Sequence, residues 1–370
     1  MLKLIIILFL PIVLFCQSIL EFENEGMNIK VEKLASNLGV IWGMTFVDKN
    51  RLLFTTRDGK FGLFDTKTKK FKYLDSPLKV FAKGQGGLLD VQTSPYFKED
   101  NTIYFTYVKT INGYGATTLA KGKFVKDKLT NIEDILVTDS RTDTTRHFGS
   151  RITFDEDDHI YFSIGDRGVR PNAQNLNNHA GSIIRLNLDG TVPSNNPFIN
   201  KKNAKIEIYS FGHRNPQGLY YDKLNKKLVS CEHGPRGGDE INIVEKGLNY
   251  GWPTISYGRE YWNPLAVGKG THKEGMEQPI HIYDPSIAPS SLLVYKGKEF
   301  KKWNGNYFLG ALKLTHLNRI VLNNRGEVIK EQRLLKTLNE RIRNIIQDKE
   351  GKLYLSTDSG NIYLLSLKER

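Results

Sequence analysis

Residues 150–166 read Ser150-Arg-Ile-Thr-Phe-Asp-Glu-Asp-Asp-His-Ile-Tyr-Phe-Ser-Ile-Gly-Asp166. An apolar strand is followed by an acidic turn and by a second strand rich in aromatic and β-branched residues, which is the pattern of an antiparallel hairpin. Five further segments repeat this pattern, and their first strands begin near Gly43, Gly87, Gly218, Ser291 and Arg343. Repeated antiparallel units at this spacing predict an all-β chain, a six-bladed β-propeller of four-stranded antiparallel sheets.

The repeats are unevenly spaced along the chain. The spacing predicts long inserts around residues 168–200 and 252–288, rich in Asn, Gly and Pro, which we expect to form ordered loops on one face. A β-sandwich is the alternative all-β architecture, and the number of copies argues against it. If the ring closes, a strand near Ile29–Val31 should pair beside the last blade, around Ile362–Leu365, so that no sheet edge stays open.

The start of the chain differs from the rest. Lys3 precedes an almost unbroken apolar run over residues 4–15, which small residues follow. This pattern predicts a signal peptide over 1–18 and one propeller domain over 19–370, located in the periplasm or secreted. The alternatives are an N-terminal anchor helix, for which the run is short, and a lipoprotein acylated at Cys16, which the bulky residue before it disfavours. Because no second apolar run occurs, we expect no stable membrane insertion.

Composition limits the partners. The 370 residues carry a formal net charge of +13, but the 53 Lys and Arg residues are spread along the chain and often lie in turns. We therefore predict no nucleic-acid partner, and expect part of the charge to line a pocket for an anionic ligand. Only two cysteines occur, and removal of a signal peptide would leave Cys231 alone, without an internal disulfide.

In a propeller, the turns that enter the inner strands converge on the central channel. Hydrogen-bonding or ionisable side chains stand at this position in most copies: Gln85, His147, Arg214 with Asn215, Ser290 with Ser291, and Arg341 with Arg343. Converging cations and amides predict an anion site. Asp166 ends the next strand of the blade that His147 opens, so its carboxylate could orient the imidazole as a base.

The segment Glu232-His-Gly-Pro-Arg-Gly-Gly-Asp-Glu240 is rich in glycine and acidic residues. Its carbonyl and carboxylate oxygens suit a hard cation such as Ca²⁺. A plain turn between two strands has the same composition, so both interpretations stay open at this point.

At these residues the chain resembles the soluble PQQ-dependent aldose sugar dehydrogenases of the glucose/sorbosone dehydrogenase family, from about residue 40 to the C-terminus. The resemblance is carried by Gly84-Gln-Gly-Gly-Leu-Leu89, His147-Phe-Gly-Ser-Arg151, Ser163-Ile-Gly-Asp-Arg167, Gly212-His-Arg-Asn-Pro-Gln-Gly218, Glu232-His-Gly-Pro235, Asn249-Tyr-Gly-Trp-Pro253, Gly310-Ala-Leu-Lys313 and Asn339-Glu-Arg-Ile-Arg343. It implies an enzyme that uses pyrroloquinoline quinone (PQQ) and Ca²⁺ to oxidise aldoses at C1 to the lactone by hydride transfer. An external electron acceptor, a quinone or a cytochrome, would complete the cycle.

The resemblance also implies roles at matching positions. His147 matches the general base, Asp166 its orienting partner, and Arg214 a catalytic cation near the quinone oxygen. The residues that match cofactor-site contacts are Gln85 (also near the substrate hydroxyl), Arg214, Asn215, Lys313, Arg341 and Arg343. The backbone carbonyls of Gly234 and Pro235 match those that hold Ca²⁺.

Two departures favour the broader aldose branch over glucose specificity. Arg146 stands before the base where glucose-specific relatives carry an acid, and the segment 283–287 lacks a tryptophan that covers the cofactor in them. Two other functions stay open. A Ca²⁺-dependent lactone hydrolase would need side-chain carboxylates on the metal, and a non-enzymatic sugar-binding propeller would not need the base and the cations.

Overall fold

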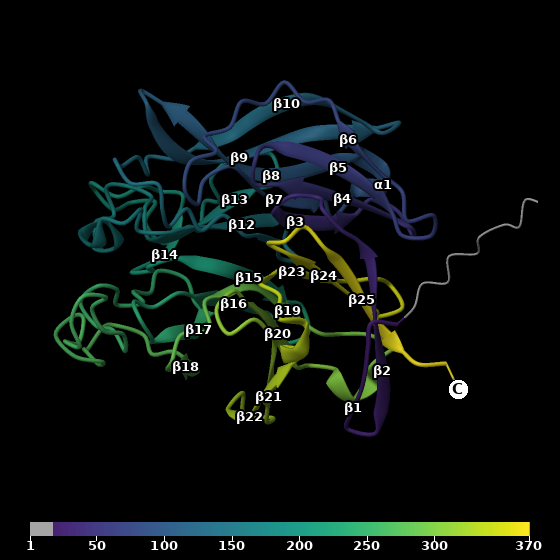
Figure 1. The fold of residues 1–370 in the computed structure, drawn as a ribbon. Helices are drawn as coiled ribbons and strands as arrows, with labels where there is room; N and C mark the ends of the chain where they lie inside the picture. Colours follow the sequence, from purple (N-terminus) through teal and green to yellow (C-terminus); the bar gives the residue numbers. More distant parts are fainter. Residues whose placement is uncertain (1–17, 370) are drawn as a thin grey trace, which may run out of the picture.

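Antiparallel sheets arranged around a central axis make up the protein (Figure 1). The computed structural model describes residues 18–369, and these form six sheets. The two inner strands of every blade coincide with the six predicted hairpins. The predicted fold class is therefore confirmed.

The blades are numbered here in chain order. Blade 1 holds β3 (Ile41–Phe46), β4 (Arg51–Thr56), β5 (Lys60–Asp65) and β6 (Phe71–Leu74). Blade 2 holds β7 (Leu88–Thr93), the short helix α1 (Phe97–Asp100), β8 (Thr102–Ile111), β9 (Tyr114–Val125) and β10 (Lys128–Val137). Blade 3 holds β11 (Ile152–Phe154), β12 (His159–Ile164), the 3-10 helix η1 (Arg170–Gln174), β13 (Ser182–Asn187) and β14 (Ile208–Phe211).

The remaining blades complete the ring. Blade 4 holds β15 (Pro216–Asp222), β16 (Lys227–Glu232), β17 (Asp239–Val244) and β18 (His281–Tyr283). Blade 5 holds β19 (Pro289–Val294), η2 (Lys301–Trp303), β20 (Tyr307–Ala311), β21 (Leu317–Leu322) and β22 (Val328–Leu334), and η3 (Lys336–Leu338) follows it. Blade 6 holds β23 (Ile342–Gln347), β24 (Leu353–Thr357), β25 (Ile362–Leu367), β2 (Met27–Ala35) and β1 (Leu20–Asn24).

Blade 6 closes the ring with both ends of the described chain. The purple strand β2 lies beside the yellow strand β25 in Figure 1, and the two pair antiparallel with Ile29 opposite Leu367 and Val31 opposite Leu365. The predicted closure is confirmed. β1 forms a hairpin with β2 and adds a fifth strand, so this blade departs from the predicted four.

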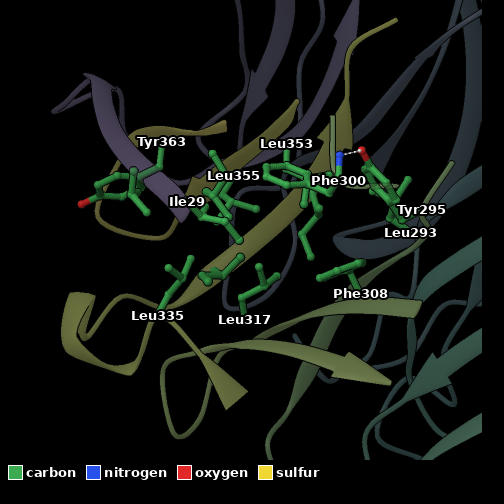
Figure 2. Close-up of a cluster of buried hydrophobic side chains, with 14 of the residues drawn as sticks. Ile29, Leu293, Tyr295, Phe300, Phe308, Leu317, Leu335, Leu353, Leu355 and Tyr363 are labelled. Atoms are coloured by element: carbon green, nitrogen blue, oxygen red, sulfur yellow. Dashed lines mark hydrogen bonds between the residues drawn. The ribbon is translucent and has the colours of Figure 1, made fainter. Parts of the chain in front are cut away.

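Hydrophobic side chains fill the space between neighbouring blades. One buried cluster joins blades 5 and 6 and includes Phe308 from β20, Leu355 from β24 and Ile29 from β2 (Figure 2). Within it, the backbone N–H of Phe300 donates to the Tyr295 hydroxyl at 3.0 Å. Because strands from both ends of the chain bury side chains in this cluster, apolar burial supports the closure that the strand pairing makes.

One side chain contacts all six blades near the axis. Arg151 lies just before β11 in blade 3 and is 3% exposed. Its guanidinium donates to Asp90 Oδ1 of blade 2 at 2.8 Å and lies over the Trp42 ring of blade 1, 4.2 Å from the centroid. Its other acceptors are the backbone carbonyls of Gln217 in blade 4, Ser290 in blade 5 and Arg343 in blade 6. Arg151 therefore ties the inner strands of the ring together.

The two predicted inserts take different courses. The end of the ring at which the inner strands begin is called here the entry end. β13 divides the first insert into two loops. Residues 165–181 connect β12 to β13 at the entry end. Residues 188–207 lie at the opposite end, because successive connections of an antiparallel sheet alternate between its two edges. The expectation of loops on one face is therefore wrong for this part. The second insert runs beside β14 through a parallel bridge between Phe211 and Asn249, which carries it back to the entry end.

Residues 18–369 contain no helix that is long and apolar enough to cross a membrane. The predicted signal peptide over 1–18 lies outside the described residues except for its last one. Cys231 is buried and carries a free thiol.

Candidate active site

His147 and Asp166 form a hydrogen-bonded pair at the entry end of blade 3. His147 lies in the turn before β11 and Asp166 in the turn after β12, and the antiparallel pairing of these strands brings the two turns together. His147 Nδ1 lies 2.6 Å from Asp166 Oδ1. Both residues are buried, with Asp166 1% and His147 9% exposed.

The surroundings fix the charge of both groups. Burial opposes ionisation of Asp166, but the hydrogen bond from His147 and the positive charge of Arg214 outweigh it and lower the pKa of the carboxyl. An ionised carboxylate can only accept, so the shared proton belongs to His147 Nδ1. Burial lowers the pKa of His147, and Arg214 adds to this effect, while Asp166 opposes it. The imidazole is therefore neutral at neutral pH, and its Nε2 can accept a proton.

Gln85 holds the backbone of the histidine. His147 adopts a φ of 58°, a left-handed conformation that costs a non-glycine residue about 1–2 kcal/mol. Its N–H donates to Gln85 Oε1 at 2.7 Å, and the N–H of Gln85 donates to the Thr145 carbonyl at 2.8 Å. The turn of blade 2 thus fixes the turn of blade 3 that carries the imidazole.

Trp252 reaches the pair from the long insert of blade 4. Its indole Nε1 donates to Asp166 Oδ2 at 2.7 Å. The guanidinium groups of Arg170 and Arg214 lie over its ring, 5.5 and 5.3 Å from the centroid. The sequence placed Trp252 only in a family phrase and gave it no role, because no local pattern connects it with a residue 86 positions away.

Arg214 and Asn215 enter from the turn before β15. The N–H of Arg214 donates to Glu232 Oε2 at 2.7 Å, and its Nη1 donates to the carbonyl of His233 at 3.0 Å. Asn215 is fully buried, and its Oδ1 accepts from the N–H of Gly149 at 3.3 Å. Its Nδ2 has no hydrogen-bond partner among the described residues. An unpaired buried donor costs about 1–3 kcal/mol, which an acceptor oxygen on a ligand would offset.

Asp358 organises the cations of blade 6. Its carboxylate accepts from Arg341 Nε at 2.9 Å and from Arg343 Nε and Nη2 at 2.8 and 2.9 Å. The Arg343 side chain is 5% exposed and that of Arg341 51% exposed. Arg341 also donates to the carbonyl of Leu312, whose neighbour Lys313 is exposed. Two guanidinium groups therefore share one carboxylate here, and Lys313 follows next to one of their acceptors in the chain, so positive charge is available for an anion.

Sequence reasoning missed Asp358, although a signal for it exists. It directly follows the second strand of blade 6, in the turn equivalent to the one that places Asp166 after the second strand of blade 3. The repeat that identified one carboxylate could have identified the other.

Backbone oxygens converge in the glycine-rich turn between β16 and β17. A Cβ on Gly234 would lie 2.2 Å from the carbonyl oxygens of Gly237 and Gly238, so only glycine fits there. The carbonyl of Pro235 accepts one hydrogen bond, from the N–H of Arg259 at 2.9 Å, and keeps a second lone pair. Hard, uncharged oxygens of this kind are ligands that Ca²⁺ accepts.

The predicted residues come together as two groups. His147, Asp166, Arg214 and Asn215 form one, and Arg341 and Arg343 form the other around Asp358, with the exposed Lys313 next in the chain to Leu312. Gln217, two residues after Asn215, joins them, because its Oε1 accepts from Arg343 Nη1 at 2.9 Å. Comparison with known proteins identifies the family of the chain. The family model described as Glucose / Sorbosone dehydrogenase matches residues 38–365.

The chain belongs to the glucose/sorbosone dehydrogenase family. It is 35% identical to the aldose sugar dehydrogenase YliI of Escherichia coli, over 92% of this chain and 93% of that protein. The structure of the soluble aldose sugar dehydrogenase of Escherichia coli in its apo-form matches with a TM-score of 0.88 at 33% identity, covering 92% of this chain and 100% of that one. The PQQ-bound aldose sugar dehydrogenase of Streptomyces coelicolor matches with a TM-score of 0.77 at 25% identity, covering 92% and 98%.

Proposed function

We propose that this member of the glucose/sorbosone dehydrogenase family is a PQQ- and Ca²⁺-dependent enzyme that oxidises aldoses at C1 to the lactone. The observation that carries the proposal is the 2.6 Å contact between His147 Nδ1 and Asp166 Oδ1 beside Arg214 and Asn215, which orients the imidazole as a base. The PQQ-bound relative from Streptomyces coelicolor supports the cofactor.

The residues present fit both PQQ and Ca²⁺. PQQ is planar and carries three carboxylates, so it needs several cations and polar contacts. The residues that would hold or flank it are Gln85, Arg214, Asn215, Lys313, Arg341 and Arg343, and the carbonyl oxygens of Gly234 and Pro235 would hold Ca²⁺. The unpaired Nδ2 of Asn215 supports the cofactor contacts, and the lone pair that the Pro235 carbonyl keeps supports the Ca²⁺ assignment. When bound, PQQ supplies a two-electron oxidant that accepts hydride, and Ca²⁺ makes it more electrophilic.

The protein's own groups manage the proton and the charge. His147 Nε2 would accept the proton of the anomeric hydroxyl as C1 is oxidised. Asp166 would stabilise the resulting imidazolium, and Trp252 keeps its carboxylate in place. Arg214, fixed by Glu232 and the carbonyl of His233, would stabilise negative charge that develops beside it.

Turnover of a His147→Ala variant tests the assignment. With PQQ and Ca²⁺ supplied, dye reduction by aldoses should fall about 10²- to 10⁴-fold, while PQQ still binds. His159→Ala is the matched control, because His159 Nδ1 lies 2.7 Å from Asp155 Oδ2 at the opposite end of the same blade. The control should retain turnover.

The same assay separates the rival functions. If the protein loaded with PQQ and Ca²⁺ oxidises no aldose but hydrolyses lactones without PQQ, the lactone hydrolase replaces the proposal. If it binds sugars and catalyses neither reaction, it is a binding propeller. Near wild-type turnover of His147→Ala would show that another group is the base.

We also propose that the enzyme works in the periplasm or outside the cell and passes electrons to an external quinone or cytochrome. The basic residue and apolar run at the start of the chain support the location. Fractionation of expressing cells, followed by mass spectrometry of the mature N-terminus, tests it. Full-length protein confined to the cytoplasm would contradict the proposal.

A further inference from the structure

Two large apolar side chains in the long insert of blade 4 are unusually exposed. Trp262 is 74% and Leu265 66% exposed, the highest values among large hydrophobic residues in the described chain, and Tyr261 is 60% exposed. Contiguous apolar surface on a soluble protein often marks a binding site. Trp42, Trp252 and Trp303 are each 5% exposed or less, so Trp262 differs from every other tryptophan of the chain.

These side chains occupy the tip of a braced hairpin over residues 258–267. Arg259 bridges antiparallel to Ala266, the N–H of Glu260 donates to the carbonyl of Leu265 at 2.9 Å, and that of Val267 to the carbonyl of Gly258 at 3.0 Å. At its base, the N–H of Arg259 donates to the Pro235 carbonyl, in the turn assigned to Ca²⁺. The tip is therefore held in a defined position.

The tip adjoins the catalytic group. Glu260 forms a bidentate ion pair with Arg170 at 2.6 and 2.7 Å, which joins the hairpin to the loop that carries Asp166. Arg214 Nη2 donates to the Tyr261 hydroxyl at 3.4 Å. Arg170 and Arg214 both lie over Trp252, which donates to Asp166. Tyr261 thus contacts Arg214, one of the charged residues beside the His147–Asp166 pair.

We infer that Tyr261 and Trp262 form a subsite for the second ring of a reducing oligosaccharide, whose first ring is oxidised at His147. This inference rests on the proposed function. A pyranose ring presents C–H groups on its faces and hydroxyls around its edge. An exposed aromatic ring with polar neighbours such as Glu260 and Asn263 complements both features. A ring linked through O4 lies on the side of the reacting ring away from C1, and the hydrogen bond from Arg214 to the Tyr261 hydroxyl places the tip beside the residues that surround His147.

Tryptophan fluorescence gives a direct test of binding. The probe is methyl β-cellobioside, which has two rings and no free anomeric hydroxyl, so the enzyme cannot oxidise it. It should protect Trp262 from acrylamide quenching, and methyl β-glucoside should protect much less. The Trp262→Phe variant supplies the baseline, because its remaining tryptophans are buried.

Kinetics give an independent test. Trp262→Ala should lower kcat/KM for cellobiose about 3- to 10-fold more than for glucose, mainly through KM, because the lost contact is made equally in the ground and transition states. Ile329→Ala is the matched control, since this side chain is 63% exposed on β22. It should leave the cellobiose-to-glucose ratio unchanged.

The outcomes separate the two proposals. If the loaded wild-type enzyme oxidises neither sugar, the proposed function fails, while the quenching experiment still reports on the subsite. Absence of protection by methyl β-cellobioside, or an unchanged sugar ratio in Trp262→Ala, overturns the subsite. Protection of Trp262 that rises with protein concentration without sugar would show that a second copy covers the tip, and would also overturn it.

Discussion

The basicity of His147 depends on opposing neighbours. Burial and Arg214 lower its pKa, and Asp166 raises it. Asp166→Asn removes the raising effect, so the pKa of His147 should fall further. Since activity is lost as the pH falls through this pKa, the acid limb of kcat/KM should move to lower pH, and plateau turnover should fall because the base is weaker. The pH profiles of kcat/KM for the wild type and the variant check this.

The second histidine–aspartate pair of blade 3, which is partly buried, provides the control for that profile. Asp155→Asn alters the partner of His159 at the far end of the blade. It should leave the acid limb in place. An acid limb that stays fixed in Asp166→Asn would assign the titration to a group other than His147.

At the scale of elements, the turn before β23 and the end of β24 form one unit, in which Asp358 holds two arginines of different exposure. Arg341→Ala and Arg343→Ala should each weaken PQQ binding, about 10- to 100-fold for a charge-assisted contact, with Arg341 toward the lower end because it is half exposed. Titration of the apo-protein with PQQ measures both affinities.

The two variants should differ in their stability to unfolding. Arg343→Ala removes the more buried of the two cations that pair with Asp358 and leaves Gln217 Oε1 without its donor, so the unfolding midpoint should fall. Arg341→Ala should change the free energy of unfolding by less than about 1 kcal/mol, as exposed ion pairs do. If neither variant alters PQQ affinity, the cofactor binds elsewhere.

At the scale of the whole molecule, Arg151 is the residue through which the blades meet. Arg151→Met should destabilise the ring by about 3–5 kcal/mol, because it leaves Asp90, which is fully buried, without its cation. Denaturant unfolding measures the loss. Adding Asp90→Asn should recover part of it, since the uncompensated charge is then removed.

A more exposed arginine provides the comparison for the stability loss in Arg151→Met. Arg51 pairs with Asp48 and Asp127 at the end of the ring opposite the entry end and has a side chain 36% exposed. Arg51→Met should cost about 1 kcal/mol or less. Equal losses in the Arg51 and Arg151 variants would show that the axial contacts are no more important than surface ones.

The sequence by itself determined the parts of this protein that depend on local chemistry. Alternating apolar residues and polar turns specify each inner hairpin, so six blades could be counted, and a strand near Ile29–Val31 could be expected beside the last blade, around Ile362–Leu365. The proximity of His147 and Asp166 follows from one hairpin, because they flank two strands that pair directly.

Only the tertiary structure decided the contacts that cross between blades. Trp252 reaches Asp166 because a parallel bridge to β14 carries its loop to the entry end, and the exposed Tyr261 reaches Arg214 along the same path. Arg151 meets all six blades because ring closure places their inner strands around one axis. Such contacts join residues far apart in the chain. They leave no periodic trace in the sequence, since each depends on the packing of whole blades and not on the pattern within one.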